Sequence, residues 1–287
     1  MFINEIVQGN ALDILKTMPS DYFNCCITSP PYFGLRDYGN SQQIGLEKTP
    51  EEYIKTLVDV FREVRRVLKK DGTLWLNIGD SYASASNKAV SNGYKNKDLI
   101  GIPWMLAFAL RSDGWYLRSD IIWHKPNAMP ESISDRPTKA HEYIFLLSKS
   151  ERYYYDKNSI KESAVSDHKS GNGFKRNARL SYKNPDGSVR GNEKQWTDVG
   201  GKRNRRSVWT VSTKPFKEAH FATFPTDLIE PCVLGGSPEG GVILDPFMGA
   251  GTTGIVALKN NRHYCGIEIN SDYIQISQNR IKTHLNS

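Results

Sequence analysis

The sequence predicts an α/β protein in which helices cover both faces of a mostly parallel sheet. Short apolar and β-branched runs alternate along the chain with segments whose apolar residues recur at helical spacing. Strands that alternate with helices in this way usually form a parallel sheet buried on both faces. No stretch of 18 apolar residues occurs in the 287-residue chain, so no membrane-spanning helix is expected.

Local patterns place the individual elements. The clearest is the helix at 50–69, because Thr49 can cap it, Pro50 suits its first turn, and apolar residues from Tyr53 onward recur at helical spacing. Asp71-Gly72 is expected to turn the chain into the next strand. The expected strands lie at 5–9, 22–28, 73–78, 116–123, 141–147, 242–244 and 264–267. The expected helices lie at 50–69, 102–110, 225–233, 252–258 and 272–281.

The positive charge of the chain is concentrated in one segment. The formal net charge is +7, yet residues 151–220 hold 16 Lys and Arg against 8 Asp and Glu, while the remainder holds 22 against 23. Within that segment, 157–207 is rich in Ser, Asn, Gly, Lys and Arg and is too long for an ordinary connection. A near-neutral body with one basic segment, interleaved with aromatic residues, predicts an insertion that faces a polyanion. A solvated loop is the alternative.

The four cysteines and the N-terminus indicate a cytoplasmic protein without a metal centre. Cys25, Cys26, Cys232 and Cys265 form no CxxC pair and no Cys/His cluster at metal-binding spacing, so we expect them to be reduced and buried. The first ten residues lack the basic and apolar regions of a signal peptide. We expect a soluble cytoplasmic protein that binds no membrane.

A glycine turn follows the expected strand at 242–244, with the sequence Asp-Pro-Phe-Met-Gly-Ala-Gly-Thr-Thr at 245–253. Gly249 and Gly251 let the backbone approach a ligand closely, and Glu268, at the end of the next strand, can accept hydrogen bonds from two ribose hydroxyls. A dinucleotide site is disfavoured because Asp245-Pro246-Phe247 intervenes between the strand and the glycines and only one further strand follows. The turn therefore predicts a nucleoside cofactor, with a purely structural tight turn as the alternative.

A proline turn, Thr28-Ser29-Pro30-Pro31-Tyr32, follows the expected strand at 22–28. The exocyclic amino groups of cytosine and adenine are weak nucleophiles because their lone pair is delocalised into the ring. Two acceptors, the Ser29 hydroxyl and the Pro30 carbonyl, would favour the tetrahedral nitrogen of the transition state. The prolines fix the backbone and remove competing N–H donors, while Tyr32 offers a ring for stacking. A base must leave its duplex to reach such a site.

Together these motifs resemble those of DNA amino-methyltransferases. DPFMGAGTT is similar to the family's cofactor motif DPFxGxGTT, and TSPPY resembles the form of its catalytic motif most associated with cytosine N4. Adenine-N6 enzymes more often carry DPPY. Segments 32–39, 77–81, 120–127, 129–132, 135–138 and 141–145 also resemble this family. The order of catalytic turn, basic insertion and cofactor turn corresponds to its circularly permuted class, called beta.

The resemblance implies the class I S-adenosylmethionine-dependent methyltransferase fold, with a seven-stranded sheet that contains one antiparallel strand. It implies S-adenosyl-L-methionine as cofactor and double-stranded DNA as partner. Residues 1–156 would form the catalytic part, 157–207 a target-recognition insertion and 208–287 the cofactor-binding part. The implied reaction is methylation of cytosine N4 in duplex DNA by base flipping and direct in-line attack, and adenine N6 is the nearest alternative.

More distant alternatives are an RNA or protein-glutamine methyltransferase and a non-catalytic DNA-binding protein with a methyltransferase shell. The first two usually carry Asn-Pro-Pro-Tyr after the cofactor motif, which the order of motifs here disfavours. The expected setting is a restriction–modification system with a cognate endonuclease as partner, or a solitary enzyme. The expected assembly is a monomer or a homodimer.

The resemblance also assigns site residues. Catalytic residues would be Ser29, Pro30, Pro31 and Tyr32. Cofactor-binding residues would be Asp245, Pro246, Phe247, Gly249, Gly251, Thr252 and Glu268, together with Asn10, Thr28, Thr223 and Phe224. Asn10 stands where many relatives have Asp. DNA-binding residues would be Arg36, Lys125, Arg136, Lys202, Arg203, Arg205 and Arg206.

Three further features have competing interpretations. Pro231-Cys232 resembles the nucleophilic dipeptide of C5-cytosine enzymes, but it lies in an expected helix and no Glu-Asn-Val partner motif exists, so we expect it to serve packing. Asp80 either contributes to the base pocket or caps a helix. His124 and His141 are expected to be structural, because direct methyl transfer needs no strong general base.

Overall fold

The structure is a computed structural model that describes residues 2–34, 42–84, 93–163, 201–214 and 224–285. Its main sheet has the strand order β1-β10-β9-β2-β3-β5-β4-β8. These strands are β1 (Glu5–Gln8), β2 (Phe23–Thr28), β3 (Leu68–Ile78), β4 (Tyr116–His124), β5 (His141–Ser148), β8 (Val208–Thr210), β9 (Val242–Asp245) and β10 (His263–Glu268). β5 is antiparallel to both neighbours, and the other pairs are parallel. The predicted mostly parallel sheet with one antiparallel strand is confirmed, and β8 adds an eighth strand at its edge.

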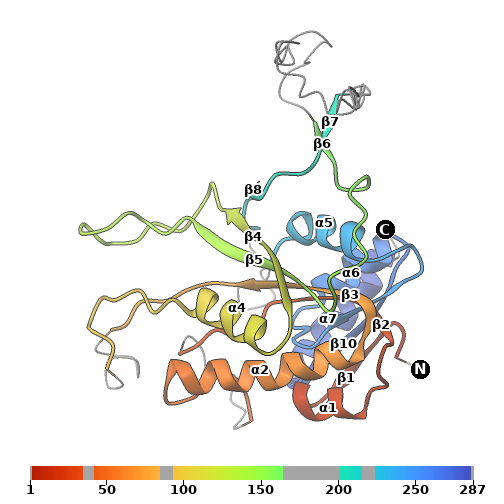
Figure 1. The fold of residues 1–287 in the computed structure, drawn as a ribbon, viewed down its shortest axis with the longest axis horizontal. Helices are drawn as coiled ribbons and strands as arrows, with labels where there is room; N and C mark the ends of the chain where they lie inside the picture. Colours follow the sequence, from red (N-terminus) through yellow and green to blue (C-terminus); the bar gives the residue numbers. More distant parts are fainter. Residues whose placement is uncertain (1, 35–41, 85–92, 164–200, 215–223, 286–287) are drawn as a thin grey trace, which may run out of the picture.

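Helices cover both faces of this sheet (Figure 1). One layer contains α1 (Ala11–Thr17), α2 (Pro50–Val67) and α4 (Ile102–Ser112), and the other contains α5 (Thr226–Gly236), α6 (Thr252–Lys259) and α7 (Ser271–Leu285). Two hydrophobic cores follow from this arrangement, because successive side chains of a strand point to opposite faces. In β2, for example, Cys26 joins the core under α2, whereas Cys25 joins the core under α5.

Helix α2 forms as the sequence predicts, with a difference at its end. The Thr49 hydroxyl accepts a hydrogen bond from the Glu52 N–H at 3.0 Å, and the helix ends at Val67, two residues early. The predicted turn at Asp71-Gly72 is wrong, since these residues lie inside β3. Pairing with β2 shifts there from Phe23–Leu68 to Cys25–Thr73. The extra residues form an irregularity in a continuous strand, because β2 holds the backbone extended on both sides of it.

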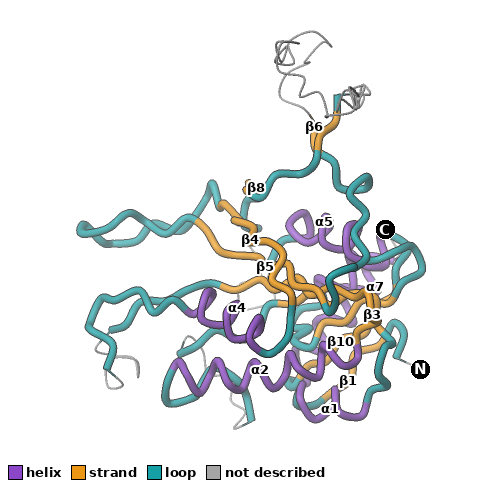
Figure 2. Tube along the Cα trace, viewed as in Figure 1, coloured by secondary structure: helices purple, strands orange, loops and turns teal. Residues whose placement is uncertain are grey.

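The elements that sequence patterns did not predict are short. α1 has only seven residues, and its N-cap is Asn10, whose side chain accepts a hydrogen bond from the Leu12 N–H at 3.0 Å. β6 (Glu162–Ser163) and β7 (Lys202–Arg203) form a separate antiparallel pair. This pair projects away from the main sheet at the base of the basic segment (Figure 2). Of that segment, residues 164–200 lie outside the described part of the chain.

Among the helices in the described ranges, each is either too short or too polar to span a lipid bilayer.

Candidate active site

The proline turn and the glycine turn meet where two neighbouring inner strands of the sheet end. β2 and β9 are adjacent parallel strands, with Cys26 paired to Leu244, so their carboxyl ends lie side by side. The Thr28 hydroxyl, at the end of β2, donates a hydrogen bond of 2.6 Å to Asp245 Oδ1, at the end of β9. Two segments 217 residues apart in the sequence are thereby joined by a direct contact.

Asp245 anchors the glycine turn through hydrogen bonds of its side chain. Its side chain is buried and accepts hydrogen bonds from Thr28, from the Thr253 hydroxyl at 2.6 Å and from the Phe247 N–H at 3.1 Å. Burial raises the pKa of the Asp245 carboxyl to about 6, although these hydrogen bonds act in the opposite direction. Both carboxylate oxygens are occupied by the protein, so this side chain shapes the turn.

The glycine turn presents an open backbone beside Glu268. Gly249 and Gly251 have φ angles of +49° and +81°, a conformation that glycine adopts without steric cost. A Cβ at Gly251 would lie 2.8 Å from the Ser277 Cβ, whereas a Cβ at Gly249 would have only the Phe247 carbonyl oxygen, at 3.9 Å, within 4 Å. Gly251 therefore permits close packing on α7, and Gly249 borders open space.

The Glu268 carboxylate is hydrogen-bonded to this turn. It accepts hydrogen bonds from the Gly249 N–H at 2.8 Å and from the Asn270 N–H at 2.9 Å. Burial raises the pKa of Glu268. An acceptor of this kind beside an open glycine backbone fits a ligand with vicinal hydroxyl groups, such as the ribose of a nucleoside.

The remaining cofactor candidates surround this turn at different depths. Pro246 and Thr252 are buried, and Phe247 and Phe224 are partly buried. Asn10 follows β1, which pairs with β10, and its side chain caps α1. Thr223 lies outside the described residues. Sequence reasoning missed Arg280 of α7. Its guanidinium donates hydrogen bonds to the Ala250 carbonyl and, at 3.4 Å, to the Thr252 hydroxyl, and these bonds stabilise the turn.

The proline turn is held by α2 and by the loop around Gly45. The Tyr53 hydroxyl donates a hydrogen bond of 2.7 Å to the Pro31 carbonyl. Gly45 has a φ of +104°, and a Cβ there would lie 2.9 Å from the Tyr32 carbonyl oxygen. Within the described ranges no donor reaches the Pro30 carbonyl, and Ser29 is partly exposed. Within these ranges, the Pro31 carbonyl therefore has a hydrogen-bond donor, whereas the Pro30 carbonyl, which the sequence predicts as an acceptor, has none.

A charged network lies beside Tyr32. The Tyr32 hydroxyl donates a hydrogen bond of 2.8 Å to Glu142 Oε2, which also accepts from Asn77 Nδ2 at 3.2 Å. Lys125 forms an ion pair with the other carboxylate oxygen of Glu142. Burial, and next the charge of Glu142, raise the pKa of Tyr32 well above its usual value. Sequence reasoning missed Glu142 and Asn77, although both stand at ends of predicted strands, which was the available signal.

Most of the predicted DNA contacts that the structure describes have intramolecular partners. The Arg136 guanidinium pairs with Glu131 at 2.7 Å and lies 3.7 Å from the centre of the Tyr82 ring. Arg203 and Arg206 both donate to Glu162 Oε1, at 2.9 and 2.7 Å, which ties the β6–β7 stem together. The same region includes Arg205, which lies over the Trp209 ring, and Lys202, which is exposed. Arg36 lies outside the described residues.

The structure shows the surroundings of Asp80 and Cys232, two of the residues with competing interpretations. Asp80 Oδ1 accepts hydrogen bonds from the Gly101 and Ile102 N–H groups, each at 3.0 Å, so it caps α4. Cys232 is buried in α5, and burial raises the pKa of its thiol well above the usual value, as its assignment to packing requires. Among the described residues, no cluster of three or more His, Cys, Asp or Glu side chains could hold a metal ion.

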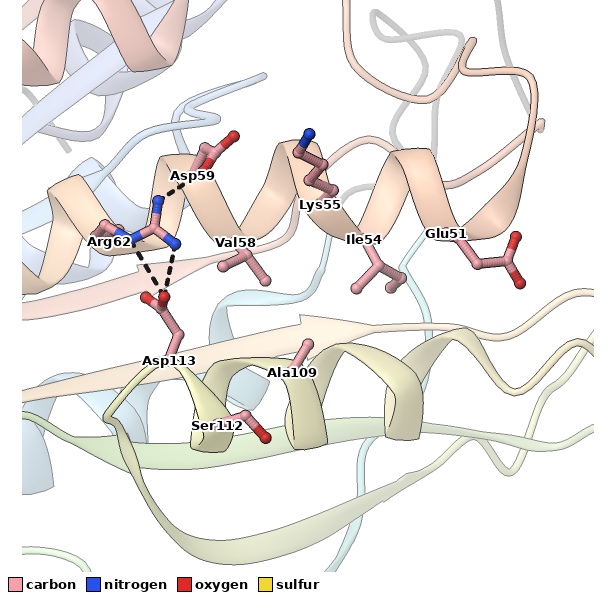
Figure 3. A pocket seen from close by; sticks show the side chains of 9 residues that line it. All are labelled: Glu51, Ile54, Lys55, Val58, Asp59, Arg62, Ala109, Ser112 and Asp113. Atoms are coloured by element: carbon pink, nitrogen blue, oxygen red, sulfur yellow. Dashed lines mark hydrogen bonds and ion pairs between the residues drawn. The ribbon is translucent and has the colours of Figure 1, made fainter.

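A shallow groove between α2 and α4 is a separate feature (Figure 3). Its floor contains Ile54 and Val58, and at one end Arg62 bridges Asp59 and Asp113 at 2.7 and 2.6 Å. No residue of the proline or glycine turn lines it. The groove is therefore not part of the site at the sheet edge.

Comparison with known proteins agrees with this geometry. The family model described as "DNA methylase", for N6 and N4 methyltransferases, matches residues 23–279. This chain belongs to that family. Type II methyltransferase M.SmaI of Serratia marcescens is 49% identical, over 96% of this chain and 90% of that protein. Type II methyltransferase M.Cfr9I of Citrobacter freundii is 48% identical, over 96% of this chain and 87% of that protein.

Solved structures show the same fold. PvuII DNA methyltransferase (cytosine-N4-specific) superposes with a TM-score of 0.67 at 18% identity, covering 98% of this chain and 91% of that one. A protein of Thermus thermophilus in complex with S-adenosyl-L-methionine gives a TM-score of 0.65 at 24% identity, covering 98% and 94%. The predicted family and the predicted methyltransferase fold are thereby confirmed.

Proposed function

We propose that this DNA methyltransferase methylates the exocyclic N4 of cytosine in duplex DNA. The observation that carries the proposal is the Thr28–Asp245 hydrogen bond, which joins the proline turn to the glycine turn. An amino group held by Ser29 and Pro30 would consequently lie beside a cofactor bound over Gly249 and Glu268. Such proximity of two reactants is itself a large part of catalysis.

The chain's own groups would act mainly by orientation and electrostatics. S-adenosyl-L-methionine would supply an electrophilic, sulfonium-bound methyl group for the lone pair of the target amino nitrogen, with a neutral thioether as the leaving group. The Ser29 hydroxyl and the Pro30 carbonyl accept the amino hydrogens and localise that lone pair. The backbone of the turn is held before reaction, because Tyr53 bonds the Pro31 carbonyl and Gly45 lies against Tyr32, so little reorganisation of the turn would be needed.

Base flipping follows from the position of the turn. Ser29 and Tyr32 are only partly exposed at the sheet edge, a depth that a stacked base inside a duplex does not reach. The Tyr32 ring would receive the extruded base by stacking. The Ser29 and Pro30 acceptors would bind the amino group and the Tyr32 ring would contact the face of the base, and together they would hold the base for in-line attack.

Cytosine is favoured over adenine by two observations. The first position of the catalytic motif is Ser29, where the form associated with adenine N6 has Asp. The cytosine-N4-specific PvuII enzyme also shares the fold over 98% of this chain. Adenine N6 is the alternative product, since the family includes both activities.

The biological setting is proposed from the relatives. Both named sequence relatives are Type II methyltransferases, which supports a cytoplasmic restriction–modification system with a cognate endonuclease. Residues 157–207 would select the target sequence, while 1–156 and 208–287 provide the catalytic and cofactor parts of one shared sheet. Phosphate contacts from Lys202 and its neighbours would position the duplex.

The product of the reaction tests the base assignment. Tritium-labelled S-adenosyl-L-methionine is incubated with the enzyme and plasmid DNA from a methylation-deficient host, and the DNA is digested to nucleosides for mass spectrometry. We expect N4-methylcytosine, and much slower labelling with the Ser29→Ala variant. Labelled N6-methyladenine would overturn the choice of base, and absence of any labelled nucleoside would contradict the proposed reaction.

A further inference from the structure

Glu142 lies where four strand ends converge beside the catalytic turn. Its carboxylate contacts Tyr32 after β2, Asn77 near the end of β3 and Lys125 after β4, while Glu142 itself is the second residue of β5. β5 is antiparallel to β3 and β4, so its beginning lies at the same edge as their carboxyl ends. The side chain of Glu142 is only 16% exposed.

The contacts of Glu142 divide between its two oxygens. Oε1 pairs with the Lys125 ammonium, which is also 4.3 Å from the centre of the Trp123 ring and is therefore fixed from two sides. Oε2 accepts from the Tyr32 hydroxyl and the Asn77 amide. A carboxylate held in this way can accept a charge-assisted hydrogen bond from Tyr32 without competition from water.

The Tyr32 ring is fixed at a second point. A Cβ at Gly79 would lie 2.8 Å from the Tyr32 Cε2 and 3.4 Å from the Glu142 carboxyl carbon. The absence of a side chain at Gly79 thus lets the ring rest against the end of β3. Hydroxyl and ring edge are both held, so the orientation of the ring is set by Gly79 and Glu142 together.

We propose that Glu142 is a positioning residue for methyl transfer and acts through Tyr32. This proposal rests on the proposed function, in which the target base stacks on the Tyr32 ring. Attack on the methyl group places positive charge on the base until its amino nitrogen releases a proton. The face of an aromatic ring attracts positive charge, and a phenol that donates to a carboxylate has a more electron-rich ring. Glu142 therefore orients the ring and strengthens its attraction for the transition state.

A double-mutant cycle on turnover tests this role. Glu142→Gln keeps the shape of the side chain and removes its charge, and Tyr32→Phe keeps the ring and removes its donor. Each single variant should lower kcat about tenfold, the size expected for one charge-assisted hydrogen bond, and leave KM for S-adenosyl-L-methionine within twofold. The double variant should be no more than about twofold slower than either single variant, because both changes remove the same interaction.

A matched control separates this effect from loss of a buried ion pair. Glu63 pairs with Arg66 at 2.7 Å and is 22% exposed, close to the exposure of Glu142. It lies near the C-terminal end of α2, whereas the proline turn is contacted by Tyr53 near the beginning of that helix. Glu63→Gln should keep wild-type kcat. A fluorescent cytosine analogue at the target position adds a spectroscopic readout, since the emission of the flipped base should change in Glu142→Gln when its stacking on Tyr32 is altered.

The outcomes distinguish this proposal from the proposed function. If wild-type enzyme methylates DNA but Glu142→Gln matches Glu63→Gln, the positioning role is wrong while the function stands. Multiplicative losses in the double variant would also overturn it, because Glu142 would then act independently of Tyr32. If Glu142→Gln does not fold, Tyr32→Phe decides alone, and full activity in that variant would refute the proposal. A wild type without methylation activity would instead contradict the proposed function.

Discussion

The cofactor half and the base half of the site are each organised around one carboxylate, in contrasting ways. Asp245 is buried and its three partners are two hydroxyls and a backbone N–H. Glu142 is partly exposed and is paired with the cationic Lys125. The first carboxylate is held in place by neutral donors, whereas the second belongs to a charged network that reaches the catalytic tyrosine.

This contrast shows how one sheet edge serves two tasks. The cofactor half is built mainly from residues 245–280, and Thr28 joins it to the proline turn, so we expect it to form as one unit. The base half draws Tyr32, Asn77, Lys125 and Glu142 from four strand ends. Substitutions in the cofactor half should mainly change stability and cofactor affinity, and substitutions in the base half should mainly change turnover.

The largest effect is expected from replacing the basic segment, because this change should weaken DNA binding and leave cofactor binding unchanged. Ser163 and Lys202 are paired in the β6–β7 stem, so a two-residue Asn-Gly turn could replace residues 164–201. Specific duplex affinity should fall about 10³-fold, the usual margin of specific over non-specific binding, while S-adenosyl-L-methionine affinity stays within twofold. Fluorescence anisotropy and calorimetry measure the two affinities. Retention of specific duplex binding would remove the recognition role from this segment.

A smaller effect is expected from Ser29→Ala in the base half. Loss of one fixed acceptor for the transition state should reduce kcat by about 10² to 10³-fold and leave the cofactor's dissociation constant unchanged. Single-turnover methylation and calorimetry test the two quantities separately. Ser119→Ala, on the exposed part of β4, is the matched control and should keep full activity. Equal losses in turnover and cofactor binding would show that the two halves are not separable.

The smallest expected effect is a pH dependence of stability from Asp245. Its folded pKa of about 6 lies above the ordinary 3.8, so the folded state binds this proton more tightly than the unfolded state does. The contribution of Asp245 to the free energy of unfolding is therefore most favourable at low pH. It decreases as pH rises from 4 to 6, by about 3 kcal/mol for a shift of this size.

Asp245→Asn isolates that contribution, because the amide does not titrate. Urea unfolding at a series of pH values should show the variant gaining stability relative to wild type between pH 4 and 6, with little further change above. The exposed Asp120→Asn variant is the control and should follow the wild-type curve. A constant difference between Asp245→Asn and wild type across this range would contradict the raised pKa.

Sequence patterns predicted the long elements well and the short ones poorly. Helix α2 has a cap, a first-turn proline and a regular apolar face, all of them local signals, so its start was predicted to the residue. α1 and β8, with seven and three residues, are too short to show periodicity. Asp71-Gly72 has the composition of a turn, but pairing with β2 keeps it inside β3. Tertiary pairing thus overrode a local preference.

The sequence by itself determined the alternation of strands and helices, the two motifs and the family, because motif residues are neighbours in the chain and their backbone preferences are local. Only the tertiary structure decided that β9 lies beside β2, so that Thr28 reaches Asp245, and that Glu142 meets Tyr32. Those contacts depend on the order of strands in the sheet. That order arises from packing across the whole chain, and no local pattern encodes it.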